Sequence, residues 1–365
     1  MAFPEKEVLK RQEYIDFLAK GISAKKNIAI LGKKKTGKTT ILNRIRDENT
    51  IYIDMDRISM SPENFSFEFT SAIVKQILNI GDADQSIEHL IEISGKLSPE
   101  AVKTAKDIEN ELQKIKPDQK MLVTLATGFG KAIATIQKKK FTLLLDNFEN
   151  IFSLNNYQEI KDILSFFDFS SKDVMYVLTS SHINFMESQL KGKGFEIRNI
   201  DYLTRDETGE LMRNYFDAAE KDIDDVFKFS HGHPYIIECI CKAYNDKKNL
   251  KKAIAFEFLS KDSRLNNFFQ LWYNDSLNRA RGKTLLSIIL KVLSTERALR
   301  LNEISRRIYR SAPVTKQLLE RLMQVDIIRK ENHNFMFSDQ SIRLWFVANE
   351  QDLDIESYDK LEEEL

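Results

Sequence analysis

Nearly continuous apolar runs alternate with helically patterned segments through the N-terminal half of the chain. The apolar runs lie at 27–31, 50–54, 141–146, 174–179 and 195–200. Apolar runs without in–out alternation are typical of parallel strands, because such strands are covered on both faces. Helical segments separate these runs, so we predict a right-handed α/β fold built on a parallel sheet.

Helical periodicity fills the intervals between the predicted strands. It indicates an amphipathic helix over 5–20 and a long helical insertion over about 61–140, to which the pattern assigns no role. Breaks in the insertion are expected at Gly81, Ser98-Pro99, Lys116-Pro117 and Gly128/Gly130.

Beyond residue 203 the pattern is helical, and a small hairpin follows near the C-terminus. Thr204 and Glu207 predict a capping box, and Pro234 is typical of the first turn of a helix. Three helices and two short strands over 276–350 follow the order of a winged-helix domain. We expect the acidic tail to fray. The predicted domains are a core at 1–203, a helical lid at 204–275, a winged helix at 276–350 and a tail at 351–365.

Residues 32–39 match the G-x-x-x-x-G-K-[ST] pattern of a phosphate-binding loop. The match lies between an apolar strand and a helical segment, which is the context that the motif requires. Its glycines permit a tight turn whose N–H groups point at phosphates. Lys38 would reach the β- and γ-phosphates, and the Thr39 hydroxyl would ligate Mg²⁺. The predicted nucleotide-binding residues of this loop are Gly32, Lys33, Lys34, Lys35, Thr36, Gly37, Lys38, Thr39 and Thr40.

A second nucleotide signal is the run Leu-Leu-Leu-Asp-Asn-Phe-Glu at 143–149. It places Asp146 at the C-terminal end of a strand, where open α/β sheets bind ligands and where Asp146 can share Mg²⁺ with Thr39. Position 147 is an amide, which cannot act as a base, so Glu149 is the candidate for polarising the attacking water and hydrolysis would be slow. The alternative is a core strand that simply ends in a turn aspartate. The predicted catalytic residues are Lys38, Asp146 and Glu149.

Polar residues follow the fourth predicted strand as Thr179-Ser180-Ser181. One interpretation is a sensor of the γ-phosphate or of the attacking water. The other is an ordinary N-cap for the following helix, and the sequence favours neither.

The segment 231–234 reads His-Gly-His-Pro, and Cys239 and Cys241 follow it. The two cysteines are two positions apart on a predicted helix, so their side chains diverge by roughly 200° and do not favour a zinc site. We interpret the segment instead as a tight turn, with Pro234 beginning a helix that packs over the nucleotide base.

Composition describes an ordinary globular protein and gives no direct indication of a partner. The chain has 365 residues, 42% of them hydrophobic, and 55 basic and 55 acidic side chains cancel to zero net charge. No window approaches 18 uninterrupted apolar residues, so no membrane span is predicted. Two closely spaced cysteines indicate reduced thiols and a cytoplasmic setting.

The charges are distributed unevenly near the C-terminus. Residues 276–350 hold 14 Lys and Arg against 7 Asp and Glu, whereas 351–365 hold seven acids and one lysine. A basic face beside the second and third predicted helices fits phosphate contacts on duplex DNA. The alternative is a solvated face on a protein-interaction module, masked by the acidic tail. The basic residues of that face are Arg306, Arg307, Arg310, Lys316 and Arg321.

In combination and order, these motifs resemble the archaeal ATPase family, which belongs with the AAA+ and STAND P-loop ATPases. The resemblance rests on the segments 32–39, 143–149, 179–181, 231–234 and 337–346. It implies an ASCE-type parallel sheet, a helical lid, a C-terminal winged helix, and ATP with Mg²⁺ as ligands. It also implies that Pro234 forms part of the wall beside adenine.

The sequence therefore predicts an ATPase that acts as a nucleotide-dependent conformational switch, with ATP or ADP bound between core and lid. Two alternatives remain open. One is a regulator that binds duplex DNA through 276–350 and is tuned by ATP. The other is a scaffold that retains its nucleotide and recruits a protein partner.

Overall fold

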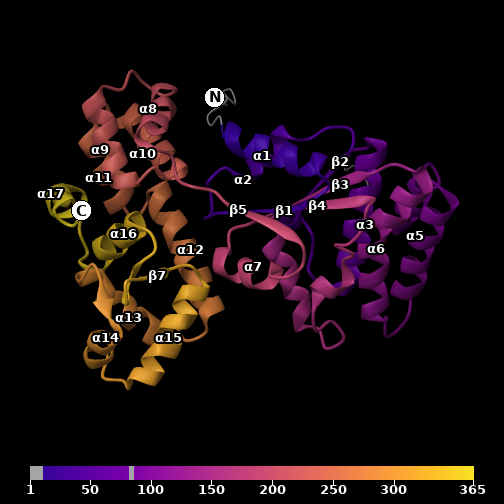
Figure 1. Ribbon diagram of the computed structural model, residues 1–365. Coiled ribbons are helices and arrows are strands. Elements are labelled where there is room, and N and C mark those ends of the chain that lie inside the picture. Colours follow the sequence, from indigo (N-terminus) through magenta and orange to yellow (C-terminus); the bar gives the residue numbers. More distant parts are fainter. Residues whose placement is uncertain (1–10, 82–85) are drawn as a thin grey trace.

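The computed structural model describes residues 11–81 and 86–365. Its first helix, α1 (Gln12–Ser23), covers most of the helix predicted over 5–20, and residues 5–10 of that prediction lie outside the described range. The α/β part and the mainly helical C-terminal part lie side by side, as Figure 1 shows.

A five-stranded sheet forms the centre of the α/β part, and all its strand pairs are parallel. The strand order is β2-β3-β4-β1-β5, so β4 separates the strand before the phosphate loop from the strand that ends in Asp146. The predicted parallel α/β fold is therefore confirmed. The strands are β1 (Asn27–Leu31), β2 (Thr50–Asp54), β3 (Phe141–Asp146), β4 (Val174–Ser180) and β5 (Phe195–Asn199).

Helices cover both faces of the sheet, which explains the continuous apolar runs. Successive residues of a strand point to opposite faces. Accordingly, Ile30 packs in one cluster with α1 and α2 (Lys38–Arg44), while Leu31 packs in the opposite cluster with the helical insertion. Each fully buried large aliphatic side chain contributes roughly 1.5–3 kcal/mol to folding.

Within its described residues the predicted insertion forms four helices, and an N-terminal side-chain cap explains where each of them begins. Ser61, Ser86, Ser98 and Asp118 each accept a backbone N–H as side-chain caps. The helices are α3 (Pro62–Leu78), α4 (Ile87–Ser94), α5 (Pro99–Leu112) and α6 (Gln119–Gln137).

The break predicted at Gly128/Gly130 is wrong, because α6 continues through both glycines. Neither glycine has the positive φ that ends a helix. A Cβ at Gly130 would lie 3.6 Å from Leu143 and 3.9 Å from Ile73, so this small residue lies where α6 contacts α3 and the sheet. Tertiary packing outweighs the roughly 1 kcal/mol helix penalty of glycine.

Short elements connect β3 to β5 on the way to the C-terminal part. After β3 the chain forms the 3₁₀ helix η2 (Phe148–Asn156) and then η3 (Ile163–Phe166). Helix α7 (Ile183–Leu190) follows β4.

Between the sheet and residue 281 the chain forms five helices, α8 to α12. The capping box predicted at Thr204 and Glu207 is present, and Pro234 occupies the first turn of its helix as predicted. The helices are α8 (Arg205–Arg213), α9 (Glu220–Ser230), α10 (Pro234–Lys247), α11 (Leu250–Leu259) and α12 (Arg264–Ala280).

The next segment contains the three helices and the hairpin that the sequence predicted for 276–350. A two-residue strand, β6, completes an antiparallel sheet of order β6-β8-β7 and was too short to predict. One hydrophobic cluster extends from α8 to the last helix of the chain. The elements are α13 (Lys283–Thr295), β6 (Leu299–Arg300), α14 (Leu301–Arg307), α15 (Ala312–Gln324), β7 (Ile328–Glu331) and β8 (Asn334–Phe337).

The tail does not fray, contrary to the sequence prediction. After α16 (Gln340–Glu350) it forms the 3₁₀ helix η4 (Ile355–Ser357) and α17 (Tyr358–Glu363), and it buries Tyr358 and Leu361 in the cluster. Arg343 donates 2.7 Å hydrogen bonds to the carboxylate and the backbone carbonyl of Glu364. Apolar burial and a charge partner therefore outweigh the repulsion between its acids.

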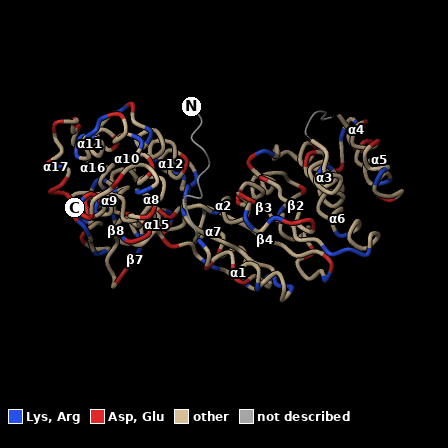
Figure 2. Tube along the Cα trace, turned by 90° about the horizontal axis from the view of Figure 1, so that it is seen from above, with Lys and Arg blue, Asp and Glu red and all other residues tan. Residues whose placement is uncertain are grey.

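Charges of both signs are interspersed over the two parts of the molecule (Figure 2). None of the described helices is both long enough and apolar enough to cross a lipid bilayer.

Candidate functional site

The loop between β1 and α2 makes a tight turn. Gly37 has φ +96° and Lys35 has φ +63°, so the chain twice enters the left-handed region. Thr36 Oγ1 donates to the Lys33 carbonyl at 2.8 Å, which closes the turn. Lys34, Lys35, Thr39 and Thr40 are exposed, whereas Gly32, Thr36 and Lys38 are buried.

Lys38 is folded onto the loop itself. Its Nζ donates to the carbonyls of Gly32 at 2.7 Å and Lys33 at 2.8 Å. Burial lowers the pKa of Lys38 to about 8, and the charges of Glu149 and Asp146 partly offset this effect. A buried amine at this point would bind an anionic phosphate strongly, because little water competes for it.

Thr39 and Asp146 meet at the carboxyl edge of the sheet, although they come from separate segments. Thr39 Oγ1 donates to Asp146 Oδ2 at 2.6 Å. Mg²⁺ is commonly held by one or two protein oxygens, with water and phosphate oxygens completing its shell. No cluster of three His, Cys, Asp or Glu within 11–81 and 86–365 could hold a metal alone. The pair therefore fits a magnesium ion that is shared with a phosphate chain.

Asp146 is held by more partners than the sequence indicated. Tyr52 donates its hydroxyl to Oδ2 at 3.0 Å, while Thr179 Oγ1 and the Asn147 N–H donate to Oδ1. Asn147 adopts φ +52° and donates its amide to Asp54 at 3.0 Å. Tyr52 and Asp54 were not identified as site residues from the sequence. A signal was present, because β2 ends in Asp54, which the structure pairs in register with Asp146 of β3.

Glu149 lies in the first turn of η2 and is 8% exposed. Its Oε1 accepts from the Ser181 N–H at 3.0 Å and from Ser181 Oγ at 2.5 Å, whereas its Oε2 is buried without a hydrogen-bond partner among the described residues. Burial alone would raise the pKa of Glu149, but the adjacent His182 and the Ser181 donors lower it. Burial lowers the pKa of His182 to about 4, so we take the carboxylate as the charged member of this pair.

The Thr179-Ser180-Ser181 segment supports the two acidic side chains. His182 occupies the N-cap of α7 and makes no side-chain capping bond. Thr179 instead donates to Asp146, and Ser181 donates to Glu149. The N-cap interpretation is therefore wrong for the hydroxyls of Thr179 and Ser181, whereas Ser180 Oγ accepts the backbone N–H of His182 at 3.0 Å, just before α7 begins.

The turn before α10 is close to the phosphate loop. The buried His233 ring lies 5.0 Å from Tyr202 and 6.2 Å from Phe268, and burial lowers its pKa to about 4. Lys35 Nζ lies 5.7 Å from the centre of the Tyr235 ring. Pro234, itself buried, therefore begins a helix whose first turn borders the loop.

Cys239 and Cys241 are both buried on α10. Burial raises the pKa of each thiol to about 12, so both stay protonated at neutral pH. Metal binding requires the thiolate, which this environment disfavours.

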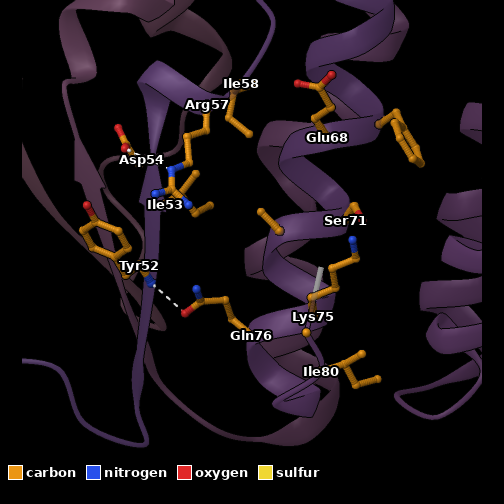
Figure 3. A pocket seen from close by; sticks show the side chains of 13 residues that line it. Tyr52, Ile53, Asp54, Arg57, Ile58, Glu68, Ser71, Lys75, Gln76 and Ile80 are labelled. Atoms are coloured by element: carbon orange, nitrogen blue, oxygen red, sulfur yellow. Dashed lines mark hydrogen bonds and ion pairs between the residues drawn. The ribbon is translucent and has the colours of Figure 1, made fainter. Parts of the chain in front are cut away.

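A pocket of about 400 Å³ lies between β2, the short 3₁₀ turn η1 (Met55–Arg57) and α3. Gln76 points across it and accepts the Tyr52 backbone N–H at 3.2 Å (Figure 3). Its lining includes no residue of the loop 32–39. The candidate site is therefore defined by the loop backbone and the strand ends, and not by this pocket.

The sheet order, the loop and the strand-end aspartate together define a P-loop NTPase fold. The fold is similar to that of a Walker-type ATPase of Pyrococcus abyssi, with a TM-score of 0.62 and 16% sequence identity. The alignment covers 94% of this chain and 97% of the other. A variant of RuvB from Thermotoga maritima is 12% identical, with 91% of this chain and 93% of that chain covered and a TM-score of 0.40. No protein-family profile and no curated protein sequence matches the chain.

Proposed function

We propose that this protein is a P-loop ATPase that binds ATP with Mg²⁺ at the loop 32–39. The observation that carries the proposal is the 2.6 Å contact between Thr39 and Asp146, because it joins the two halves of a magnesium site. The buried Lys38 supplies a cation for the β- and γ-phosphates. Pro234, at the start of α10, forms part of the adenine wall between the core (1–203) and the lid (204–275).

Each side chain of the site has a role in this chemistry. Thr39 and Asp146 would hold Mg²⁺, which neutralises charge on the transferring phosphoryl group. Tyr52 and Thr179 orient the Asp146 carboxylate. The unpaired Oε2 of Glu149 is the acceptor for the proton of an attacking water. Asn147 cannot assist as a base, so we propose slow hydrolysis that resets a conformational switch.

Replacing Glu149 with glutamine tests the proposed hydrolysis. We expect phosphate release to fall about 100-fold, since a general base typically contributes 10²–10⁴-fold to the rate. Affinity for Mg·ATP should stay within twofold, because Glu149 is not placed on the phosphates. Phosphate release and equilibrium binding are measured on the same preparations, with and without Mg²⁺.

Glu196→Gln is the matched control, because its exposed side chain pairs with Lys26 on a strand end away from Asp146. An unchanged rate in Glu149→Gln would contradict the role of Glu149. Stoichiometric nucleotide that survives purification, without phosphate release from the wild-type protein, would favour the scaffold function instead.

A second candidate function is binding of duplex DNA through a winged helix at 276–350. One observation favours it: Tyr309 is 87% exposed at the turn between α14 and α15. Arg306 and Arg310 line the same shallow surface. Arginine side chains beside an exposed tyrosine hydroxyl suit hydrogen bonds to the phosphate oxygens of a duplex.

The double substitution Arg306→Ala and Arg310→Ala tests this second function. Loss of two phosphate contacts should weaken binding at low salt and reduce the slope of log K against log salt by about 2. Gel-shift titrations at several salt concentrations measure both quantities. Arg205→Ala on α8 is the control. A wild-type protein that binds no duplex at low salt excludes this function.

A further inference from the structure

A buried ion pair joins the phosphate loop to the C-terminal part of the chain. Lys33 Nζ donates to Ser338 Oγ at 2.8 Å and lies 3.7 Å from Asp339 Oδ2. The side chains of Lys33 and Asp339 are only 16% and 1% exposed. Lys33 belongs to the nucleotide-binding motif, whereas Ser338 and Asp339 connect β8 to α16. The loop is therefore in direct contact with the C-terminal part of the chain.

Asp339 keeps several partners besides Lys33. Its Oδ1 caps α16 by accepting the N–H groups of Ser341 and Ile342, and Tyr202 donates its hydroxyl to Oδ2. Burial alone would raise the pKa of Asp339, but the charge of Lys33, the nearby His233 and the Tyr202 hydrogen bond lower it. The helix cap and the Tyr202 hydrogen bond therefore hold the carboxylate in place independently of Lys33.

The buried ammonium group of Lys33, in contrast, needs the nearby charge of Asp339 to offset its loss of hydration. Burial lowers its pKa, and the charge of Asp339 partly offsets that effect. If Lys33 moved away from Ser338 and Asp339, it would need another acceptor or anion, because a buried amine without a partner is costly. Lys33 is therefore the member of the pair that can exchange partners.

The same residue also holds Lys38. The Lys33 carbonyl accepts from Lys38 Nζ and from Thr36 Oγ1, both at 2.8 Å. Lys38 Nζ has three donors, and the carbonyls of Gly32 and Lys33 take two of them. A triphosphate that draws the ammonium from the Lys33 carbonyl would remove one constraint on the peptide of residue 33. The phosphates also offer Lys33 a multiply charged anion to exchange for a single carboxylate.

We propose that the ion pair of Lys33 and Asp339 is a latch between the phosphate loop and the C-terminal part of the chain. Nucleotide phosphates would break this ion pair by binding Lys33. The proposal rests on the proposed function, because it requires phosphates at the loop. A second contact does not involve Lys33 and would remain: Asn184 on α7 donates its backbone N–H to Asp326 at 3.2 Å and its side-chain amide to the Met323 carbonyl at 2.8 Å. Release therefore loosens the domain without detaching it.

Thermodynamic linkage makes the latch measurable. If bound nucleotide weakens the latch, then a weakened latch must strengthen nucleotide binding by the same factor. Asp339→Asn removes the charge but keeps a good N-cap and an acceptor for Tyr202. We expect it to lower the dissociation constant of Mg·ATP at least fivefold. Hydrogen exchange of β7, β8 and the start of α16 should rise on addition of ATP to the wild-type protein and be high in the variant without ATP.

Asp352→Asn is the matched control, because this aspartate of the C-terminal segment is 85% exposed and pairs only with the exposed Lys261 in the described structure. Equal affinities in wild type and Asp339→Asn, with unchanged hydrogen exchange, would overturn the latch alone. Absence of Mg·ATP binding by the wild-type protein and both variants would overturn the proposed function. Ser338→Ala removes the 2.8 Å acceptor and should strengthen binding in the same direction if Asp339→Asn does not fold.

Discussion

Lys38→Ala should weaken Mg·ATP binding by three orders of magnitude or more while the protein stays folded. The substitution removes a buried cation whose two present acceptors are loop carbonyls. Removing a charged hydrogen-bond donor from a desolvated anion site typically costs several kcal/mol, and about 1.4 kcal/mol corresponds to tenfold in affinity. Calorimetric titration with Mg·ATP measures the change.

Stability should change little in the same variant. Burial lowers the pKa of Lys38 to about 8, so the buried charge costs the folded state about 3 kcal/mol at neutral pH. This cost is fully present below pH 8 and disappears as the pH rises through the unfolded pKa near 10.5. Lys38→Ala removes this cost, but it also removes the packing of the buried lysine stem and the two hydrogen bonds that hold the loop carbonyls, and these two effects oppose each other. Urea unfolding at pH 7 should therefore differ from wild type by less than about 1 kcal/mol.

Lys26→Ala is the control for Lys38→Ala, because Lys26 is an exposed lysine before β1 that pairs with Glu196. Undiminished Mg·ATP affinity in Lys38→Ala would refute the assignment of the loop. Loss of folding at pH 7 would instead show that Lys38 is a structural residue.

The fold could be predicted from sequence largely because its strands are buried on both faces. The predicted bounds of β1, β2 and β3 agree with the structure, since each is an apolar run between polar residues. The helix starts at Thr204 and Pro234 could also be predicted, because each is marked by residues within one turn of it. The continuous α6 and the folded tail were missed, because in both cases distant packing decides the conformation.

The candidate site was predictable only where a motif or a strand end carries the signal. The loop and Asp146 are such cases, and the structure brings Thr39 to Asp146 across 107 positions of sequence. Tyr52 and Asp54 join them through the pairing of β2 with β3, a register that the sequence alone does not specify. The contact of Lys33 with Ser338 spans 305 positions and depends on how the C-terminal part docks. Nothing local marks Ser338 or Asp339 as its partners.

Gly232→Ala should destabilise the protein by at least about 3 kcal/mol, within the range of backbone strain combined with a steric clash. Gly232 has φ +81°, and an added Cβ would lie 1.9 Å from the backbone oxygen of Leu203. A side-chain rotation cannot relieve that contact, because the atom met is a backbone oxygen. Leu203 also donates its N–H to the Gly232 carbonyl at 2.9 Å, so moving the backbone apart would break a hydrogen bond. Urea unfolding with a common m-value measures the loss.

Substitutions at two other glycines separate the two causes of this destabilisation, which are backbone strain and the steric clash. Gly194 has φ +80° with no atom within 4 Å of its Cβ position, so Gly194→Ala should cost only the backbone strain of about 1 kcal/mol. At Gly209 the Cβ would meet the flexible end of Ile223 at 2.8 Å, and the substitution should change stability by less than about 1 kcal/mol. Equal losses in Gly232→Ala and Gly194→Ala would contradict the clash with Leu203. A larger loss in Gly232→Ala would show that the close backbone contact between residues 203 and 232, just before α10, leaves no room for a side chain.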